Sequence, residues 1–188
     1  MNRSFGALIM VGLLAAATPA TAEIRERSME VGGFLLYADF DQDSNIDDDV
    51  GIGGRFGIVF EENHELEFSF DFISTEDDQN LGLDVDLITA RAGYVYNFLP
   101  RETISPLLTV GAGVQNVNIS DSSLGPFGTI VDDTDPLVFG GVGVRFFLGD
   151  SFNIRLDGQI QAVFPDGSED TFVDSLLMVG AGWILGGH

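Results

Sequence analysis

The chain has 188 residues, enough for one domain, and contains no cysteine, which excludes a disulfide framework and a lipoprotein acylation site. Its formal net charge is −22 and it contains no lysine, so it lacks the basic surface that nucleic-acid binding requires. A disordered acidic chain is also disfavoured, because 45% of the residues are hydrophobic and 16 are phenylalanine.

Residues 1–22 have the features of a secretory signal peptide. Arg3 supplies a positive start, and Ala7–Ala17 is an apolar stretch too short to span a bilayer as a helix. Ala20-Thr21-Ala22 has the small-residue pattern of a cleavage site, so we expect cleavage near Ala22. The mature domain, residues 23–188, then carries 7 Arg against 30 Asp and Glu. Later apolar runs are short and interrupted, which predicts no transmembrane helix.

The mature sequence alternates between apolar and polar residues with the period of a β-strand. Glu65–Phe72, which reads E-L-E-F-S-F-D-F, places an aromatic face opposite an acidic one. Eight such segments are predicted: Glu30–Phe40, Val50–Phe60, Glu65–Phe72, Leu87–Phe98, Ile104–Gln115, Leu137–Leu148, Phe152–Phe164 and Leu176–Leu185. Each has about the length of a tilted membrane strand of ~9–11 residues.

The connections between these segments alternate between long and short. Glu61–His64, Pro100–Glu102 and Gly149–Ser151 are short turns, whereas the other four connections are longer. Short turns at one end and long loops at the other are typical of an outer-membrane barrel. We therefore predict an all-β fold, an eight-stranded antiparallel up-and-down transmembrane β-barrel over residues 23–188, in which the last strand pairs with the first.

Alternation alone does not say which face is outside, because a soluble barrel of lipocalin type would turn its apolar face inward. The polar face is rich in glycine, which suits a narrow interior better than a solvated surface. These glycines are Gly51, Gly53, Gly57, Gly93, Gly111, Gly113, Gly141 and Gly143. Aromatic residues also gather near the strand ends, as expected for belts at the two membrane interfaces. Phe60, Tyr94, Tyr96, Phe98, Phe146, Phe152 and Trp183 lie toward the short turns, and Tyr37, Phe72 and Phe164 toward the loops.

The polar face also carries charges of both signs. Its charged residues include Arg55, Glu67, Asp71, Arg91, Arg145, Arg155 and Asp157. Enclosed charges must be paired, so these residues predict an Arg–carboxylate network that fills the lumen. Glu67 and Asp71 are expected to accept hydrogen bonds from neighbouring strands, where Arg55 and Arg91 are nearest in sequence order. The alternative is that the arginines are scattered over a solvated surface.

Three hairpins resemble those of the small OmpA-like/OmpX-like outer-membrane barrels. They read V-G-I-G-G-R-F-G-I-V-F with H-E-L-E-F-S-F-D-F, I-T-A-R-A-G-Y-V-Y-N-F, and L-V-F-G-G-V-G-V-R-F-F-L. The resemblance covers the mature chain and implies location in the cell outer membrane, surrounded by its lipid and lipopolysaccharide. It also implies loops facing outside the cell and insertion by the barrel-assembly machinery. Gly180–Leu185 is similar to the C-terminal strand signal that this machinery reads.

The residues needed for catalysis are missing from the loop end. His64 and His188 both lie toward the short-turn end, so Ser74, Ser120 and Ser122 have no evident base. We therefore predict no enzymatic activity, no catalytic residue and no cofactor.

The loop ends carry 19 of the 30 acidic residues and no cationic residue. Asp41, Asp43, Asp47 and Asp49 form a weak candidate site for divalent cations. They do not form an EF-hand, because Ile46 stands where glycine is required and Ile52 where glutamate is required. The alternative is a solvated acidic rim suited to a saline habitat.

The longest loop, Asn116–Asp135, groups several apolar residues, which indicates either a partner contact or a hairpin extension resting on the rim. These residues are Leu124, Pro126, Phe127, Ile130 and Val131. The sequence thus leaves three functions open: a structural role in the envelope, a small cation-preferring channel, or a surface adhesin or receptor acting through its loops.

Overall fold

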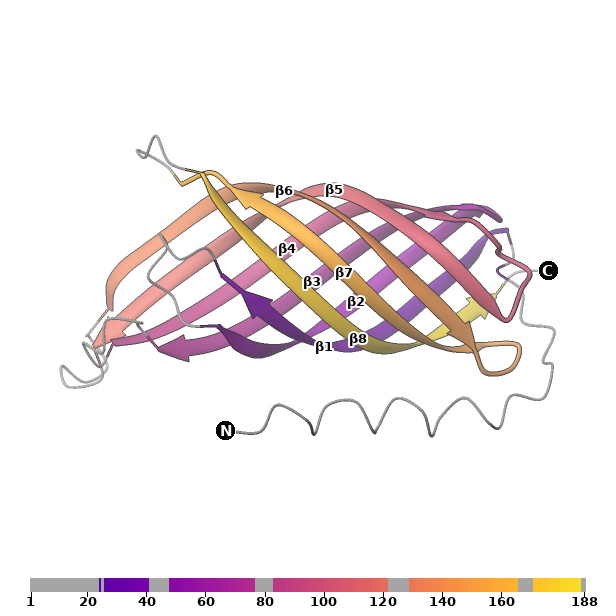
Figure 1. Ribbon diagram of the computed structural model, residues 1–188, viewed down its shortest axis with the longest axis horizontal. Helices are drawn as coiled ribbons and strands as arrows, with labels where there is room; N and C mark the ends of the chain where they lie inside the picture. Colours follow the sequence, from indigo (N-terminus) through magenta and orange to yellow (C-terminus); the bar gives the residue numbers. More distant parts are fainter. Residues whose placement is uncertain are drawn as a thin grey trace, which may run out of the picture.

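Eight antiparallel strands form a closed barrel in a computed structural model, which describes residues 24, 26–40, 48–76, 83–121, 129–165 and 171–186 (Figure 1). The strands are β1 (Ser28–Asp39), β2 (Asp49–Glu61), β3 (His64–Glu76), β4 (Leu83–Asn97), β5 (Ile104–Asp121), β6 (Thr129–Phe147), β7 (Phe152–Val163) and β8 (Phe172–Gly186). Each strand pairs with the next along the chain, which confirms the predicted up-and-down topology. Within the described ranges, no helix is both long enough and apolar enough to cross a membrane.

The barrel closes through the pairing of β1 with β8. This pairing is antiparallel and runs from Ser28 opposite Gly186 to Asp39 opposite Ser175. The predicted contact between the first and last strands is therefore confirmed. Closure leaves no open edge, so the backbone N–H and C=O groups at the seam are paired as they are elsewhere in the sheet.

The hairpin of β5 and β6 is longer than the sequence indicated. The two strands contain 18 and 19 residues, and their pairing continues from Gln115 opposite Asp135 to Ser120 opposite Thr129. The prediction of a loop over Asn116–Asp135 was wrong for these paired residues, whereas Leu124, Pro126 and Phe127 lie outside the described residues, so their role stays a prediction. Cross-strand bonds stabilise it, because the Asn116 side-chain amide donates to the Asp133 carbonyl and the Thr134 hydroxyl at 3.1 and 3.0 Å.

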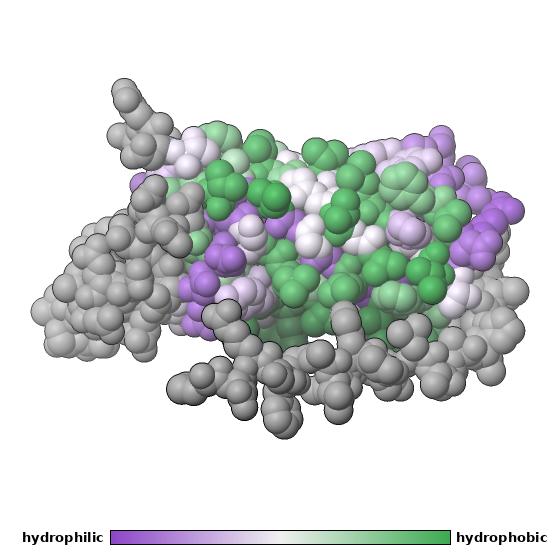
Figure 2. Space-filling view, in the orientation of Figure 1, coloured by the Kyte–Doolittle hydropathy of each residue, from purple (hydrophilic) through white to green (hydrophobic). Residues whose placement is uncertain are grey.

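The apolar face of the strands is the outer surface of the barrel. Phe68, Phe70 and Phe72 of β3 are exposed, whereas Glu65, Glu67 and Asp71 of the same strand are buried. Figure 2 shows hydrophobic side chains over the middle of the visible face and hydrophilic ones gathered toward its ends. The prediction that the apolar face points outward is therefore confirmed, and an apolar band of this kind is what a transmembrane barrel presents to hydrocarbon.

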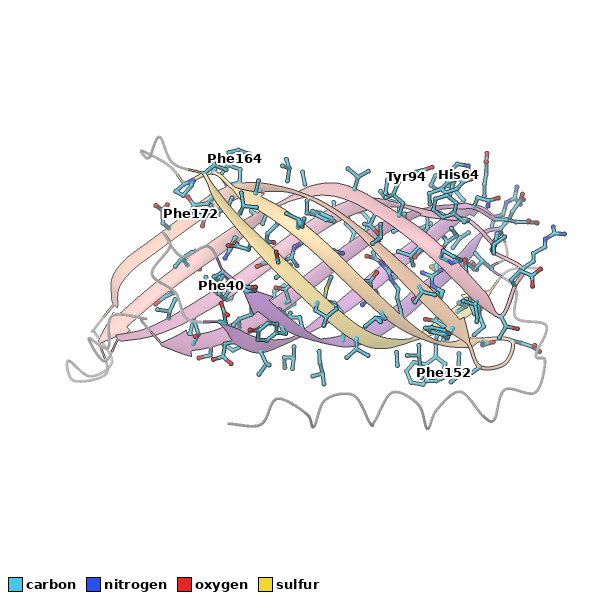
Figure 3. All side chains as sticks on the ribbon, in the orientation of Figure 1. Phe40, His64, Tyr94, Phe152, Phe164 and Phe172 are labelled. Carbon is cyan, nitrogen blue, oxygen red and sulfur yellow. The ribbon has the colours of Figure 1, made fainter. Side chains whose placement is uncertain are left out.

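Aromatic side chains mark the two ends of this band. His64, Tyr94 and Phe152 lie toward the short-turn end in Figure 3, and Phe164 lies toward the loop end. At the short-turn end, the rings of Phe152 and Trp183 pack against each other with centroids 5.0 Å apart. The arrangement is typical of aromatic belts at membrane interfaces.

Glycines inside the barrel permit close approach between strands. A Cβ atom added at Gly111 of β5 would collide with the Ala92 carbonyl oxygen and come within 2.7 Å of Gly93 Cα. Both contacts are with backbone atoms of β4, which cannot move aside without disturbing the sheet. Glycine is therefore required at this position by packing.

We expect Phe70→Arg to destabilise the barrel by about 2–4 kcal/mol, because Phe70 is 55% exposed near the middle of the lipid-facing band. Val50→Arg is the matched control, since Val50 is exposed near the loop end of β2 and should cost only about 0–1 kcal/mol. Equilibrium unfolding in lipid vesicles measures both values. Equal stability of Phe70→Arg and wild type would contradict the lipid assignment.

A second pair of variants tests interior packing. Gly111→Ala should cost about 1–3 kcal/mol because the new methyl group overpacks the sheet. Gly158→Ala on the outer face should be close to neutral, because no atom lies within 4 Å of the added Cβ. The same unfolding measurement checks both, and a neutral Gly111→Ala would disprove the packing requirement.

The lumen as the candidate functional site

An ion-pair layer lies inside the barrel near the short turns. The guanidinium of Arg145 on β6 contacts two carboxylates, Glu30 on β1 at 2.9 Å and Glu65 on β3 at 3.1 Å. Asn97 at the end of β4 links the two sides, because its oxygen accepts from Arg145 Nη1 at 3.2 Å and its amide donates to Glu65 at 3.4 Å. Arg145 and Glu65 are fully buried, and Glu30 is almost so. One cation therefore holds two anions from strands that are not neighbours.

The middle layer centres on Arg155 and Asp157, which lie two residues apart on β7 and so point to the same side. Arg155 Nε donates to Asp157 Oδ1 at 2.8 Å, and its Nη1 pairs with Glu67 of β3 across the lumen. Arg55 of β2 completes the layer by donating to Asp157 Oδ2 at 3.1 Å. The Arg55 guanidinium also lies 4.8 Å from the ring centroid of Phe34, a cation–π contact.

The third layer lies closer to the loops. Arg91 of β4 pairs with Asp71 of β3 and also donates to the side-chain oxygen of Gln161 at 2.9 Å. The amide of Gln161 in turn donates to Asp174 at 3.0 Å and to Gln115 at 3.4 Å. Amide side chains therefore extend the ion pairs into a hydrogen-bonded network that joins β3, β4, β5, β7 and β8.

Apolar clusters lie on both sides of these polar layers. Ile24, Val59, Phe147 and Ile184 pack together at the short-turn mouth. The backbone N–H of Ile24 donates to the Pro100 carbonyl at 2.9 Å, so the segment before β1 is tied to the turn between β4 and β5. Toward the loops, two further clusters contain buried residues of β1, β3, β4, β6, β7 and β8. The charged layers are thus enclosed by hydrophobic side chains at both ends.

The structure brings the seven predicted lumenal residues together inside the barrel. Asp71 pairs with Arg91 on the neighbouring strand, as the sequence indicates. Glu67 instead pairs with Arg155 on β7, and Arg55 with Asp157, so the pairing of Glu67 with its nearest arginine was wrong. The tilt of the strands explains the difference, because residues far apart in sequence meet across a narrow lumen.

Sequence reasoning missed two acidic partners of Arg145. Glu30 was overlooked because the segment that contains it is apolar nearly throughout, and Glu65 because it is the first residue of its predicted strand. Glu30 and Glu65 each precede an outward-facing apolar residue, as the period of two in a β-strand requires. This alternation would have identified both as inward-facing residues. With them, the described interior holds seven buried carboxylates and four buried guanidiniums, and these carboxylates include Asp135 and Asp174.

The loop candidates fall largely outside the described residues. Asp41, Asp43 and Asp47 lie there, as does Ser122. Asp49 begins β2, where its side chain accepts a hydrogen bond from the Val50 backbone at 2.6 Å. Across the part of the chain that the structure describes, no group of three or more His, Cys, Asp or Glu side chains is placed to hold a metal ion. The signal peptide and its cleavage site also stay predictions.

Solved structures of several outer-membrane proteins share this fold. The N-terminal β-barrel domain of Pseudomonas aeruginosa OprF is 15% identical, with a TM-score of 0.57 over 86% of this chain and 99% of that one. Ail, the attachment invasion locus protein of Yersinia pestis, is 18% identical, with a TM-score of 0.57 over 85% and 99%. OprG from Pseudomonas aeruginosa is 10% identical, with a TM-score of 0.58 over 88% and 99%. A search of curated proteins found no match.

A closed barrel with an apolar exterior and a charged interior defines a transmembrane β-barrel of the outer membrane. The sequence model of the outer membrane protein beta-barrel domain matches residues 7–184. The chain therefore belongs to this family, and the predicted resemblance to small outer-membrane barrels is confirmed.

Two substitutions in the Arg145 layer should have very different effects. Arg145→Met leaves Glu30 and Glu65 buried without their cation, and we expect a loss of about 3–5 kcal/mol. Glu30→Gln keeps the bond between Arg145 and Glu65 and removes one excess negative charge, so it should cost less than about 1 kcal/mol. Equilibrium unfolding compares the two. Similar losses for both variants would show that charge imbalance does not govern this layer.

Proposed function

We propose that the protein is a small structural barrel of the outer membrane, closed to ions by its Arg–carboxylate network. The observation that carries this proposal is the burial of the network: Arg145 is 0% exposed, and Arg155 and Asp157 are each 1% exposed. A continuous water path would have to pass these side chains and would leave them wetted. Their mutual ion pairs hold them in place across the lumen.

The apolar clusters support the same proposal. An ion crossing the barrel would have to lose its hydration shell beside Phe147 and Ile184 at one end and beside Leu87 and Met178 at the other. Hydrophobic constrictions of this type oppose conduction because water leaves them. The charged layers alone would favour cations, because carboxylates outnumber guanidiniums. A small cation-preferring channel would therefore require the apolar clusters at both ends of the lumen to move.

Single-channel recording from the purified mature protein in planar bilayers tests the closed barrel, and we expect no conductance steps. Insertion is verified in parallel with Trp183, the only tryptophan, which is 54% exposed on the outer face. Quenching of its fluorescence by brominated lipids shows that the protein is in the bilayer. An absence of conductance steps then means that the inserted barrel is closed. Reproducible cation-selective steps would overturn the proposal in favour of the channel.

The long β5–β6 hairpin supports a second candidate function, contact with a partner outside the cell. Its strands are the longest of the barrel, with 18 and 19 residues, and their pairing continues to Ser120 opposite Thr129. Replacing residues 119–131 with a two-residue Asn-Gly turn removes the end of this hairpin and leaves the paired residues below it. Loss of cell attachment on this change, but not on replacement of residues 166–170, would favour the adhesin or receptor.

We further propose that the outer face contacts outer-membrane lipid and lipopolysaccharide, and that the barrel-assembly machinery inserts the chain. The exposed apolar residues of all eight strands support the lipid contact. Divalent cations at the acidic loops stay a proposal that rests on sequence alone. Calorimetric titration of the refolded barrel with Ca²⁺ tests it, and the absence of saturable heat would remove it.

A further inference from the structure

Outside the lumen, ionisable and aromatic side chains gather on the outer face of β2, β3 and β4 at the short-turn end. His64 lies at the centre of this group. Its ring centroid is 5.8 Å from those of Phe60 and Tyr94, and 5.3 Å from that of Tyr96. Figure 3 shows His64 and Tyr94 together at that end of the barrel. We call Phe60, Glu61, His64, Tyr94 and Tyr96 the turn-end cluster.

Polar contacts run through the turn-end cluster. One ring nitrogen of His64, Nδ1, is hydrogen-bonded to the Tyr94 hydroxyl, and the other, Nε2, lies 3.6 Å from Glu61 Oε2. The Glu61 side chain is 67% exposed, so its carboxylate also faces the surroundings. The adjacent Glu62 is engaged elsewhere, because Arg101 donates to it at 3.0 Å and this bond lowers the pKa of Glu62. Glu61 is thus the carboxylate that gives the aromatic surface its negative charge.

The position of the cluster indicates what it meets. Short turns of outer-membrane barrels lie on the periplasmic side, so these side chains are at the level of the lipid headgroups in the periplasmic leaflet. An aromatic belt by itself needs only ring surfaces, and on β7 and β8 the same belt consists of the ring pair Phe152 and Trp183. The turn-end cluster adds a carboxylate, an imidazole and a hydroxyl that this pair lacks.

We propose that the turn-end cluster binds the primary ammonium headgroup of a zwitterionic phospholipid. The ammonium donates hydrogen bonds to the Glu61 carboxylate and lies against the aromatic rings, which attract cations through their π faces. The lipid's acyl chains continue along the apolar residues of β3 and β4, including Leu66 and Phe68. An anionic headgroup would instead place like charge beside Glu61. The site does not depend on whether the lumen conducts.

Lipid retention tests this site. The folded barrel is equilibrated in nanodiscs of equal parts phosphatidylethanolamine and phosphatidylglycerol with identical acyl chains, released into mild detergent, and analysed by native mass spectrometry. We expect wild type to retain phosphatidylethanolamine over phosphatidylglycerol by about three- to tenfold, the scale of one exposed ion pair plus one cation–π contact. Glu61→Gln, which is isosteric and exposed, removes the ion pair and should reduce this preference to the smaller part that the aromatic rings supply.

Phe152→Leu is the matched control, because it alters the aromatic belt on β7 without touching the turn-end cluster. It should keep the wild-type preference, whereas Tyr96→Leu should reduce it by removing a ring surface. Folding of every variant is checked by its heat-modifiable migration on gels. Equal retention of the two lipids by wild type, or an unchanged preference in Glu61→Gln, would overturn the proposal.

Discussion

The hydrocarbon core of a membrane offers no hydrogen-bond partner, and this constraint shapes the whole molecule. Each backbone N–H or C=O left open in lipid would cost several kcal/mol, so β1 must pair with β8 along its full length. Closing eight strands fixes a narrow lumen that side chains can fill. Because alternate residues point inward, the same closure gathers polar side chains from all parts of the chain into one small space.

The narrow lumen relates two features of the sequence, the inward-facing glycines and the long charged side chains. The glycines leave the volume that the charged side chains occupy. Gly57 leaves room for the Glu65 carboxylate, since a Cβ atom there would collide with it. Gly143 does the same for Asp157, whose Oδ1 would lie 2.5 Å from an added Cβ. Both carboxylates thus occupy volume that a glycine on the neighbouring strand leaves free. The interior is therefore packed by complementary sizes as well as by complementary charges.

The sequence predicted the faces of the strands well and their partners less well. In Glu65–Phe72, simple alternation placed every side chain on the correct side, because an antiparallel strand has no other regular choice. The bond between Arg155 and Glu67 spans 88 residues and depends on strand tilt, which no local pattern encodes. The end of β5 was also missed. Asn116 and Asn118 favour turns in isolation, yet pairing with β6 keeps them extended.

The cluster at the short-turn mouth also constrains the order of assembly. Ile24 precedes β1 and Ile184 lies near the end of β8, yet the two are buried in one group with Val59 and Phe147. Residues from the two termini can meet there only after the final strand has docked. The apolar cluster at the short-turn mouth is therefore complete only when β1 and β8 are paired. Closure of the sheet and the apolar cover over the charged layers at this mouth thus depend on the same pairing of β1 with β8.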